Sequence, residues 1–200
     1  INMLMEGFMN EFVMGSNRKI DPARRAHLKA DNTPADNDRV EIGPTALAFD
    51  EWAARGLVPP DMPALREYRL ARLQQQISHH DCAGLLLFDP LNIRYATDTT
   101  NMQLWIAHNM ARACFVPPEG PVVLWDFHNC EHLSAHLPLV GEVRSGASFF
   151  YFETGDQTER AAAAFADQMI DVMRQHAGNN KRLAIDKIEH IGYAKLRERG

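Results

Sequence analysis

Several features that usually reveal a function are missing from this sequence of 200 residues. It has only three cysteines, widely spaced and without a C-x-x-C pair, so we expect free thiols in a reducing compartment, the cytoplasm. No apolar run reaches the roughly 20 residues that a bilayer-spanning helix needs. The net charge of −5 and the lack of a basic patch argue against nucleic acid and anionic membranes as partners.

The short motifs that indicate catalysis are also missing. The sequence contains no G-x-G-x-x-G segment, no P-loop and no G-x-S-x-G segment. Dinucleotide binding, phosphate binding on a P-loop and serine-hydrolase chemistry are therefore disfavoured. The residues alone supply neither a complete catalytic set nor a convincing set of metal ligands.

One local motif does suggest chemistry. His128, Glu131 and His132 match H-x-x-E-H, the inverted zinc-peptidase pattern, and His136 follows one helical turn later. On a helix the first two histidines could share a zinc ion, with Glu131 as the base. A surface helix that happens to carry histidines is the simpler interpretation, because the chain has nine histidines and no clear acidic ligand downstream. We favour that interpretation.

The apolar pattern divides the chain near residue 62. Residues 1–62 are rich in turn formers, which predicts an extended N-terminal arm with short helices, one of them at 44–55. From residue 63 onwards, helical and strand-like patterns alternate. The predicted helices cover residues 63–79, 128–137, 156–176 and 188–199. The predicted strands cover residues 83–88, 92–97, 111–116, 121–127, 139–145 and 182–188.

This alternation predicts the α/β class: a mixed five- or six-stranded sheet flanked by helices, over residues 63–200. The sheet is expected to be mixed because P-P-E-G joins the third and fourth predicted strands, which is typical of an antiparallel hairpin. Cys114 and Cys130 have apolar neighbours, and we expect both of them in the core.

A tryptophan and a histidine in the segment DTTNMQLWIAHN have no evident structural reason. Trp105 and His108 are three residues apart, so they share one face of a helix or one side of a loop. From the residues alone, a core tryptophan with a neighbouring histidine is favoured. The alternative is a ligand pocket or a subunit interface, where tryptophan is enriched because its ring is large, rigid and polar at one edge.

Residues 63–200 resemble the N-terminal domain of the creatinase/prolidase/aminopeptidase P family. The resemblance rests on a helix with an early Arg (Arg66 or Arg69), on the run GLLLFDPLNIRYATD, and on its Asn-hydrophobic-x-Tyr motif at 92–95. Many members have a Gly soon after that Tyr, where this chain has Asp98. The Pro-rich arm and NMQLWIAHNMARACFVP are similar to the dimethylsulfoniopropionate lyases of this family, the DddP type.

The resemblance implies a function. Lyases of this type are dimers that cleave a small sulfonium zwitterion to dimethyl sulfide and acrylate. Their metal ligands and catalytic base lie in a C-terminal "pita-bread" domain, which is absent from these 200 residues. We therefore expect no catalytic residue, metal ligand or cofactor in this chain, and an iron- or zinc-like metal ion in the missing catalytic domain.

The resemblance also changes the interpretation of Trp105. In family dimers the N-terminal domain of one subunit reaches over the active site of the other, and a Trp in the corresponding loop matches Trp105. A sulfonium ion has no hydrogen to donate, but an aromatic face can hold it, for about 0.5–2 kcal/mol. We predict that Trp105 and His108 bind substrate at the inter-subunit pocket of a homodimer. Two alternatives stay open: the N-terminal domain of an Xaa-Pro aminopeptidase or prolidase-like metallopeptidase, and a non-catalytic interaction domain.

Overall fold

The computed structural model describes residues 46–127, 130, 133, 134 and 137–200. A five-stranded sheet with the order β4-β3-β2-β1-β5 lies at its centre. Strands β2 and β3 form an antiparallel hairpin, β1 is antiparallel to β2 and parallel to β5, and β3 is parallel to β4. The predicted mixed sheet is confirmed, with five strands. They are β1 (Gly84–Leu87), β2 (Ala113–Val116), β3 (Val122–Trp125), β4 (Val140–Arg144) and β5 (Leu183–Ile185).

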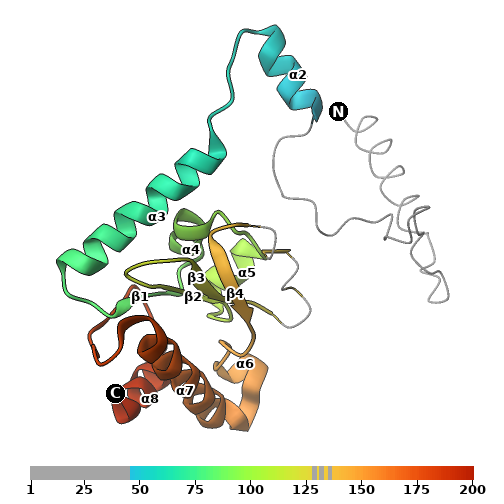
Figure 1. Ribbon diagram of the computed structural model, residues 1–200. Helices are drawn as coiled ribbons and strands as arrows, with labels where there is room; N and C mark the ends of the chain where they lie inside the picture. The colour runs from blue at the N-terminus through green and yellow to red at the C-terminus, as the bar shows by residue number, and fades with distance from the viewer. Residues whose placement is uncertain (1–45, 128–129, 131–132, 135–136) are drawn as a thin grey trace, which may run out of the picture. The chain divides into compact units, whose positions relative to one another are not determined.

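Helices cover both faces of the sheet. Helices α3 (Met62–His79) and α4 (Pro90–Thr97) lie on one face, and α7 (Thr158–Ala177) and α8 (His190–Arg199) lie on the other (Figure 1). Successive residues of β2 alternate between the two cores: Phe115 packs with α7, and Cys114 packs with α3. A strand covered on both faces needs an apolar residue at every position, which explains the continuous apolar runs in the sequence.

The predicted helices that fall on the described residues are confirmed. The prediction at 44–55 corresponds to α2 (Ala46–Ala54), and the others correspond to α3, α7 and α8 with slightly different ends. Helix α3 begins where the sequence supplies a cap: the Asp61 side chain accepts a hydrogen bond from the Ala64 N–H at 3.0 Å, and Pro63 lies in the first turn. A short helix α6 (Tyr151–Thr154) and one 3-10 turn, η2 (Gly155–Gln157), precede α7.

The prediction of a strand at 92–97 is wrong, because this segment forms helix α4. The Asp89 carboxylate accepts hydrogen bonds from the N–H groups of Leu91 (2.9 Å) and Asn92 (3.3 Å), and Pro90 occupies the first turn. Asp-Pro therefore starts a helix here, since Asp is a strong N-cap and the fixed φ of Pro suits the first helical position. Ile93, at 0% exposure, anchors α4 to the core.

Helix α4 ends at Asp98, which has a left-handed backbone with φ 61°. Glycine is the usual residue at such a helix end, and Asp is one of the few others that adopt this conformation readily. The Asp98 carboxylate also accepts a hydrogen bond from Nε of Arg66 at 2.8 Å. An Asp where the family resemblance leads us to expect Gly thus adopts a left-handed backbone and adds a tie to α3.

A second carboxylate joins β5 to the start of α4. Asp186 accepts hydrogen bonds from the backbone N–H groups of Phe88 (2.9 Å) and Asp89 (3.0 Å) and from Nδ2 of Asn92 (3.1 Å). The Asn of the Asn-hydrophobic-x-Tyr motif therefore has a structural role in placing α4 against the sheet.

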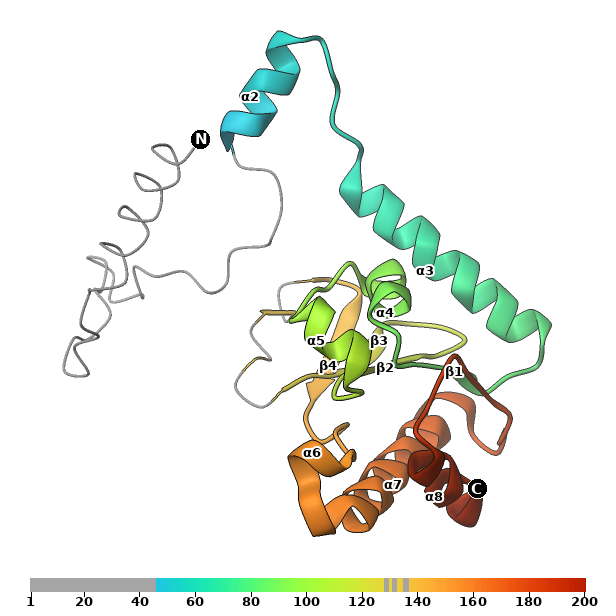
Figure 2. The ribbon, with the colours of Figure 1, turned by 180° about the vertical axis from the view of Figure 1, so that it is seen from behind.

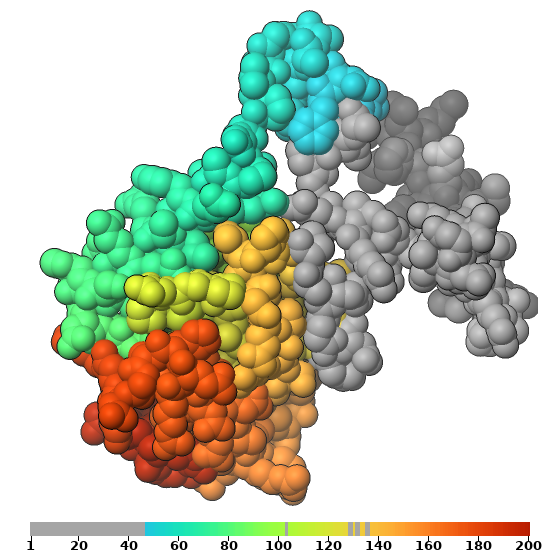
Figure 3. Space-filling view, viewed as in Figure 1, coloured from blue at the N-terminus to red at the C-terminus, as the bar shows by residue number. Residues whose placement is uncertain are grey.

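The turn between β2 and β3 lies beside α3. Figure 3 shows this yellow turn at the surface next to the green side chains of α3, and Gln74 Nε2 donates a hydrogen bond to the Gly120 carbonyl at 2.7 Å.

Among the described residues, no helix is both long and apolar enough to cross a membrane.

The cysteines follow the core prediction only in part. Cys114 is fully buried, and burial is the main cause that raises the pKa of its thiol to about 12. The positive charge of Arg112 acts to lower this pKa, and the negative charge of Asp186 acts to raise it. This thiol therefore stays protonated and behaves as a small apolar side chain. Cys130 is only half-buried, so the core prediction does not hold for it.

The Asp89 cap predicts a pH-dependent contribution to stability. Partial burial acts to raise the Asp89 pKa, but hydrogen bonds from Leu91, Asn92 and Lys187 outweigh it and hold this pKa below the ordinary 3.8. The stabilisation is therefore present above pH 3.8 and is lost as the pH falls through the lower pKa of the folded protein. We expect Asp89→Ala to lower the free energy of unfolding, measured with urea at pH 7, by about 1 kcal/mol.

Asp89→Asn is the matched control, because asparagine also caps helices but does not titrate. It should retain most of the stability at pH 7 and show a flatter dependence of stability on pH as the pH falls below 3.8. Identical pH profiles for the wild type and Asp89→Asn would contradict this account of the cap.

Candidate functional site

Trp105 and His108 lie on α5 (Gln103–His108), a helix of six residues beside α4 (Figure 2). The helix starts from Met102, which has a left-handed backbone with φ 39°, and Ile106 anchors it to the core at 1% exposure. Asn109 ends it, because both its backbone N–H (3.0 Å) and its side-chain Nδ2 (3.1 Å) donate to the Trp105 carbonyl. Of the two placements that the sequence left open, a helix or a loop, the structure shows the helix.

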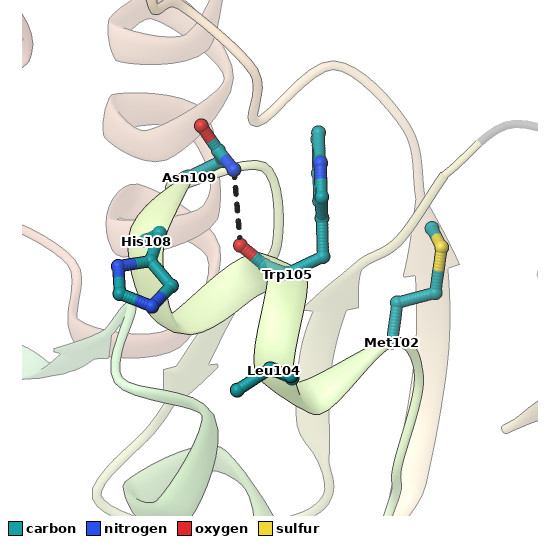
Figure 4. A pocket seen from close by; sticks show the side chains of 5 residues that line it. All are labelled: Met102, Leu104, Trp105, His108 and Asn109. Atoms are coloured by element: carbon teal, nitrogen blue, oxygen red, sulfur yellow. Dashed lines mark hydrogen bonds between the residues drawn. The ribbon is translucent and has the colours of Figure 1, made fainter.

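An open pocket of about 640 Å³ is built around this helix. Figure 4 shows that the Trp105 and His108 side chains leave α5 in different directions, so they line different parts of the pocket. Met102 and Leu104 are 53% and 81% exposed, which is high for large apolar side chains. The lining consists of Met102, Leu104, Trp105, His108 and Asn109.

The Trp105 indole rests on two aromatic rings from distant parts of the chain. Its centroid lies 5.6 Å from the ring of Phe127 and 5.9 Å from the ring of Phe150, both in tilted or edge-on geometry. Phe127 follows β3, and Phe150 immediately precedes α6. Pairs in this geometry contribute about 0.5–1.5 kcal/mol beyond the area they bury. Trp105 is thus half-buried against two rings that hold its orientation.

A buried ion pair lies next to this aromatic cluster in the chain. Arg112 Nε donates to Asp126 Oδ2 at 3.0 Å, and both side chains are 0% exposed. The other carboxylate oxygen accepts hydrogen bonds from Asn101 Nδ2 (2.7 Å) and from the Phe127 N–H (2.9 Å). Arg112 Nη2 donates to Thr99 Oγ1 at 2.6 Å and to Ser134 Oγ at 3.3 Å. In the described part of the chain Nη1 of Arg112 is buried without a hydrogen-bond partner.

The chemical capacity of the site follows from its lining. An indole, a thioether and an aliphatic side chain offer apolar and aromatic surface, and His108 and Asn109 are the polar members. Such a surface can hold a soft cation or an apolar group against the indole, and it carries no carboxylate to act as a base. Within the described ranges no three His, Cys, Asp or Glu side chains are grouped as metal ligands would be. The described residues therefore do not fit the metal ion that the family resemblance implies, and we derive no step through it.

The zinc motif cannot be placed in this arrangement. His128, Glu131, His132 and His136 all lie outside the described residues, as do residues 1–45 of the predicted arm. The interpretation of these histidines and the boundary at residue 62 stay predictions from the sequence.

The site contains residues that the sequence analysis missed. Phe127 and Phe150 come from remote segments, and no local spacing connects them with Trp105. Arg112 and Asp126 could have been found from the hairpin register, which pairs Ala113 with Trp125. Arg112 precedes Ala113 and Asp126 follows Trp125, so the two face each other across the open end of the hairpin. Opposite charges at facing positions of a predicted hairpin are a recognisable signal.

The sheet order, the helices on both faces and the pocket on α5 define an α/β domain that presents an aromatic surface. The chain belongs to the creatinase/prolidase N-terminal domain family, whose model matches residues 69–199.

Two curated relatives are more specific. The chain is 53% identical to the dimethylsulfoniopropionate lyase DddP of Roseovarius nubinhibens and 49% identical to that of Roseobacter denitrificans, over 183 residues in each case. Each match covers 92% of this chain and 41% of the relative, so the chain spans about two fifths of the length of these proteins.

Solved structures of lower identity are also similar. The Xaa-Pro dipeptidase from Bacillus anthracis matches with a TM-score of 0.45 and 12% identity, over 66% of this chain and 31% of that chain. The N-terminal domain of the Xaa-Pro dipeptidase from Lactobacillus brevis matches with a TM-score of 0.44 and 18% identity, over 65% and 86% respectively.

The buried ion pair predicts a large loss of stability when one partner is removed. Arg112→Met leaves the Asp126 carboxylate buried without its countercharge, and we expect the free energy of unfolding to fall by about 3–5 kcal/mol. Replacing both partners, in Arg112→Met/Asp126→Leu, should cost less than the single change because no charge is left buried. Urea unfolding followed by far-UV circular dichroism measures both.

An exposed ion pair offers the matched control. Arg174 lies 3.5 Å from Asp171, with side chains 70% and 63% exposed, so Arg174→Met should change stability by less than about 1 kcal/mol. Equal losses for Arg112→Met and Arg174→Met would contradict the importance of the buried pair.

Proposed function

We propose that this chain is the N-terminal, dimer-forming and pocket-completing domain of a metal-dependent, cytoplasmic lyase that cleaves dimethylsulfoniopropionate. The observation that carries the proposal is its similarity, at 53% and 49% identity, to two lyases of that name. The matched length of 183 residues exceeds the segment 63–200, so the similarity extends into the first 62 residues, whereas the family model covers residues 69–199 only. Similarity in the arm favours the lyases over a generic member of the family.

The proposed role of Trp105 is to hold the sulfonium group of the substrate in a neighbouring subunit's pocket. The indole face attracts a cation that cannot be held by hydrogen bonds. A base outside this chain removes the proton next to the carboxylate, and the electron pair of that C–H bond forms the double bond of acrylate. The C–S bond breaks towards sulfur, and neutral dimethyl sulfide leaves. The positive charge on sulfur therefore disappears during the reaction.

Because the positive charge on sulfur disappears during the reaction, the loss of Trp105 should affect one kinetic parameter more than the other. A ring that attracts the cation stabilises the bound substrate at least as much as the transition state, so its loss should appear mainly in KM rather than in kcat. We expect Trp105→Ala to raise KM for dimethylsulfoniopropionate about 2- to 30-fold, which corresponds to about 0.5–2 kcal/mol of cation–π attraction. Trp105→Phe should show a smaller rise because it keeps a ring.

The measurement uses a chimaera of this chain with the remaining C-terminal part of the Roseovarius nubinhibens lyase. Leu104→Ala is a control for the loss of an exposed apolar side chain from the same pocket without loss of the ring. His108→Ala tests the second predicted site residue and should have a weaker effect than Trp105→Ala. Unchanged KM and kcat in Trp105→Ala would contradict the role assigned to Trp105. Turnover of Xaa-Pro dipeptides but not of the sulfonium compound would favour the peptidase alternative.

The proposal also assigns the metal to the part of the relatives that this chain does not span. We expect the purified 200-residue chain to release no dimethyl sulfide, with or without added iron or zinc salts. The chimaera should lose activity on treatment with a chelator and regain it with metal, because the ligands are expected in its C-terminal part. Sustained, metal-dependent release of dimethyl sulfide by the isolated chain contradicts this assignment.

A further inference from the structure

Helix α5 is too short to fix its own position. It has six residues, and isolated helices of this length do not persist in water. Met102 at its start makes no side-chain cap bond, so the backbone that enters and leaves the helix must be held by other groups. The orientation of Trp105 therefore depends on what holds the residues on either side of α5.

One carboxylate holds both sides. Asn101, immediately before Met102, donates to Asp126 Oδ1, and Arg112, shortly after the end of α5, donates to Asp126 Oδ2. The segment that carries the pocket is therefore hydrogen-bonded at both of its ends to the same buried side chain. Arg112 extends this hold to the preceding loop through Thr99 Oγ1, which lies 2.8 Å from the Thr97 hydroxyl at the end of α4.

The same carboxylate also holds the ring beneath the indole. The Phe127 backbone N–H donates to Asp126 Oδ1, and the Phe127 ring lies 5.6 Å from that of Trp105. Because Asp126 is 1% exposed, water does not compete for these bonds, and they keep their strength in a medium of low dielectric constant.

We propose that Asp126 is a positioning residue for Trp105: its carboxylate fixes the two flanks of α5 and the backbone of Phe127, and thereby sets the orientation of the indole. Asp126 touches no substrate in this assignment and acts through the tryptophan. The functional meaning of that orientation rests on the proposed function, whereas the orientation itself can be tested without it.

Asp126→Asn is the primary variant. It keeps the size of the side chain, but the amide nitrogen must face either the Arg112 Nε–H or the N–H groups of Asn101 and Phe127. In both orientations donor meets donor on one side, and the negative charge that pairs with Arg112 is lost. Asn101→Ala is a milder second variant, which removes one hydrogen bond and leaves the Arg112–Asp126 pair in place. Asp186→Asn is the matched control, since it alters the other carboxylate that accepts several N–H groups, at the start of α4.

The first measurement is ¹⁹F NMR of the 200-residue chain labelled with 5-fluorotryptophan. Three tryptophans give three resonances, and Trp105→Phe identifies the one that belongs to Trp105. Asp126→Asn, and Asn101→Ala to a smaller extent, should shift and broaden the Trp105 resonance and leave that of Trp52 unchanged. Asp186→Asn should leave the Trp105 resonance in place.

The second measurement is a double-mutant cycle on KM in the chimaera. Asp126→Asn should raise KM by about 2- to 30-fold, the range expected for Trp105→Ala. When Trp105 is already alanine, Asp126→Asn should have no further effect on KM. A role confined to stability would add its effect in both backgrounds.

The outcomes separate the two proposals. A Trp105 resonance that stays in place in both Asp126→Asn and Asn101→Ala, or that moves equally in Asp186→Asn, overturns the positioning role. A shifted resonance together with unchanged KM in Trp105→Ala supports the positioning role and overturns the proposed function instead. If Trp105→Ala raises KM as expected, but the effects of Asp126→Asn and Trp105→Ala on KM are additive, the positioning role alone is overturned.

Discussion

The buried Arg112–Asp126 ion pair is the interaction on which the site depends. Two charges in an apolar interior are costly unless most of their remaining hydrogen-bonding groups are satisfied. Asn101, Thr99 and the Phe127 N–H supply such bonds, and among the described residues only Nη1 of Arg112 is left without a partner in this pair. The ion pair thereby joins the end of the β2–β3 hairpin to the segment that carries α5. A pair of apolar residues at the same places would fill the volume, but it would give the flanks of α5 no directional bonds.

Much of the fold could be predicted from the sequence because the sheet is covered on both faces. Continuous apolar runs then mark the strands, and the amphipathic spacing of residues 63–79 and 156–176 marks the covering helices. The strand predicted at 92–97 fails for a physical reason: in a short segment beginning with Asp-Pro, Ile93 and Tyr95 fit the alternation of a strand, but Ile93, Ala96 and Thr97 are the buried face of a helix. The pair Asp89-Pro90 does not decide between the two structures by itself, because Asp followed by Pro is common both at the start of a helix and in a turn.

The candidate site was predictable in one part and not in another. No rule for turns or cores requires Trp105, and the spacing of three residues places it near His108, on a helix or in a loop; the structure shows a short helix. The rings that support it do not, since Phe127 and Phe150 meet Trp105 only after the sheet has formed. The Arg112–Asp126 pair is intermediate: the hairpin register contains it, but only when charges at strand ends are compared across the turn.

An aromatic face is a suitable holder for a sulfonium substrate because its attraction is weak and ends with the charge. A carboxylate would bind the cation more strongly, yet it would also oppose the loss of positive charge as the C–S bond breaks, and it would repel the substrate's own carboxylate. An indole attracts the cation, and once sulfur is neutral only dispersion remains to retain dimethyl sulfide. Such weak binding depends on the orientation of the ring more than a salt bridge does. The proposed function would therefore give a physical reason for placing Trp105 on a segment held by buried charges rather than on a free loop.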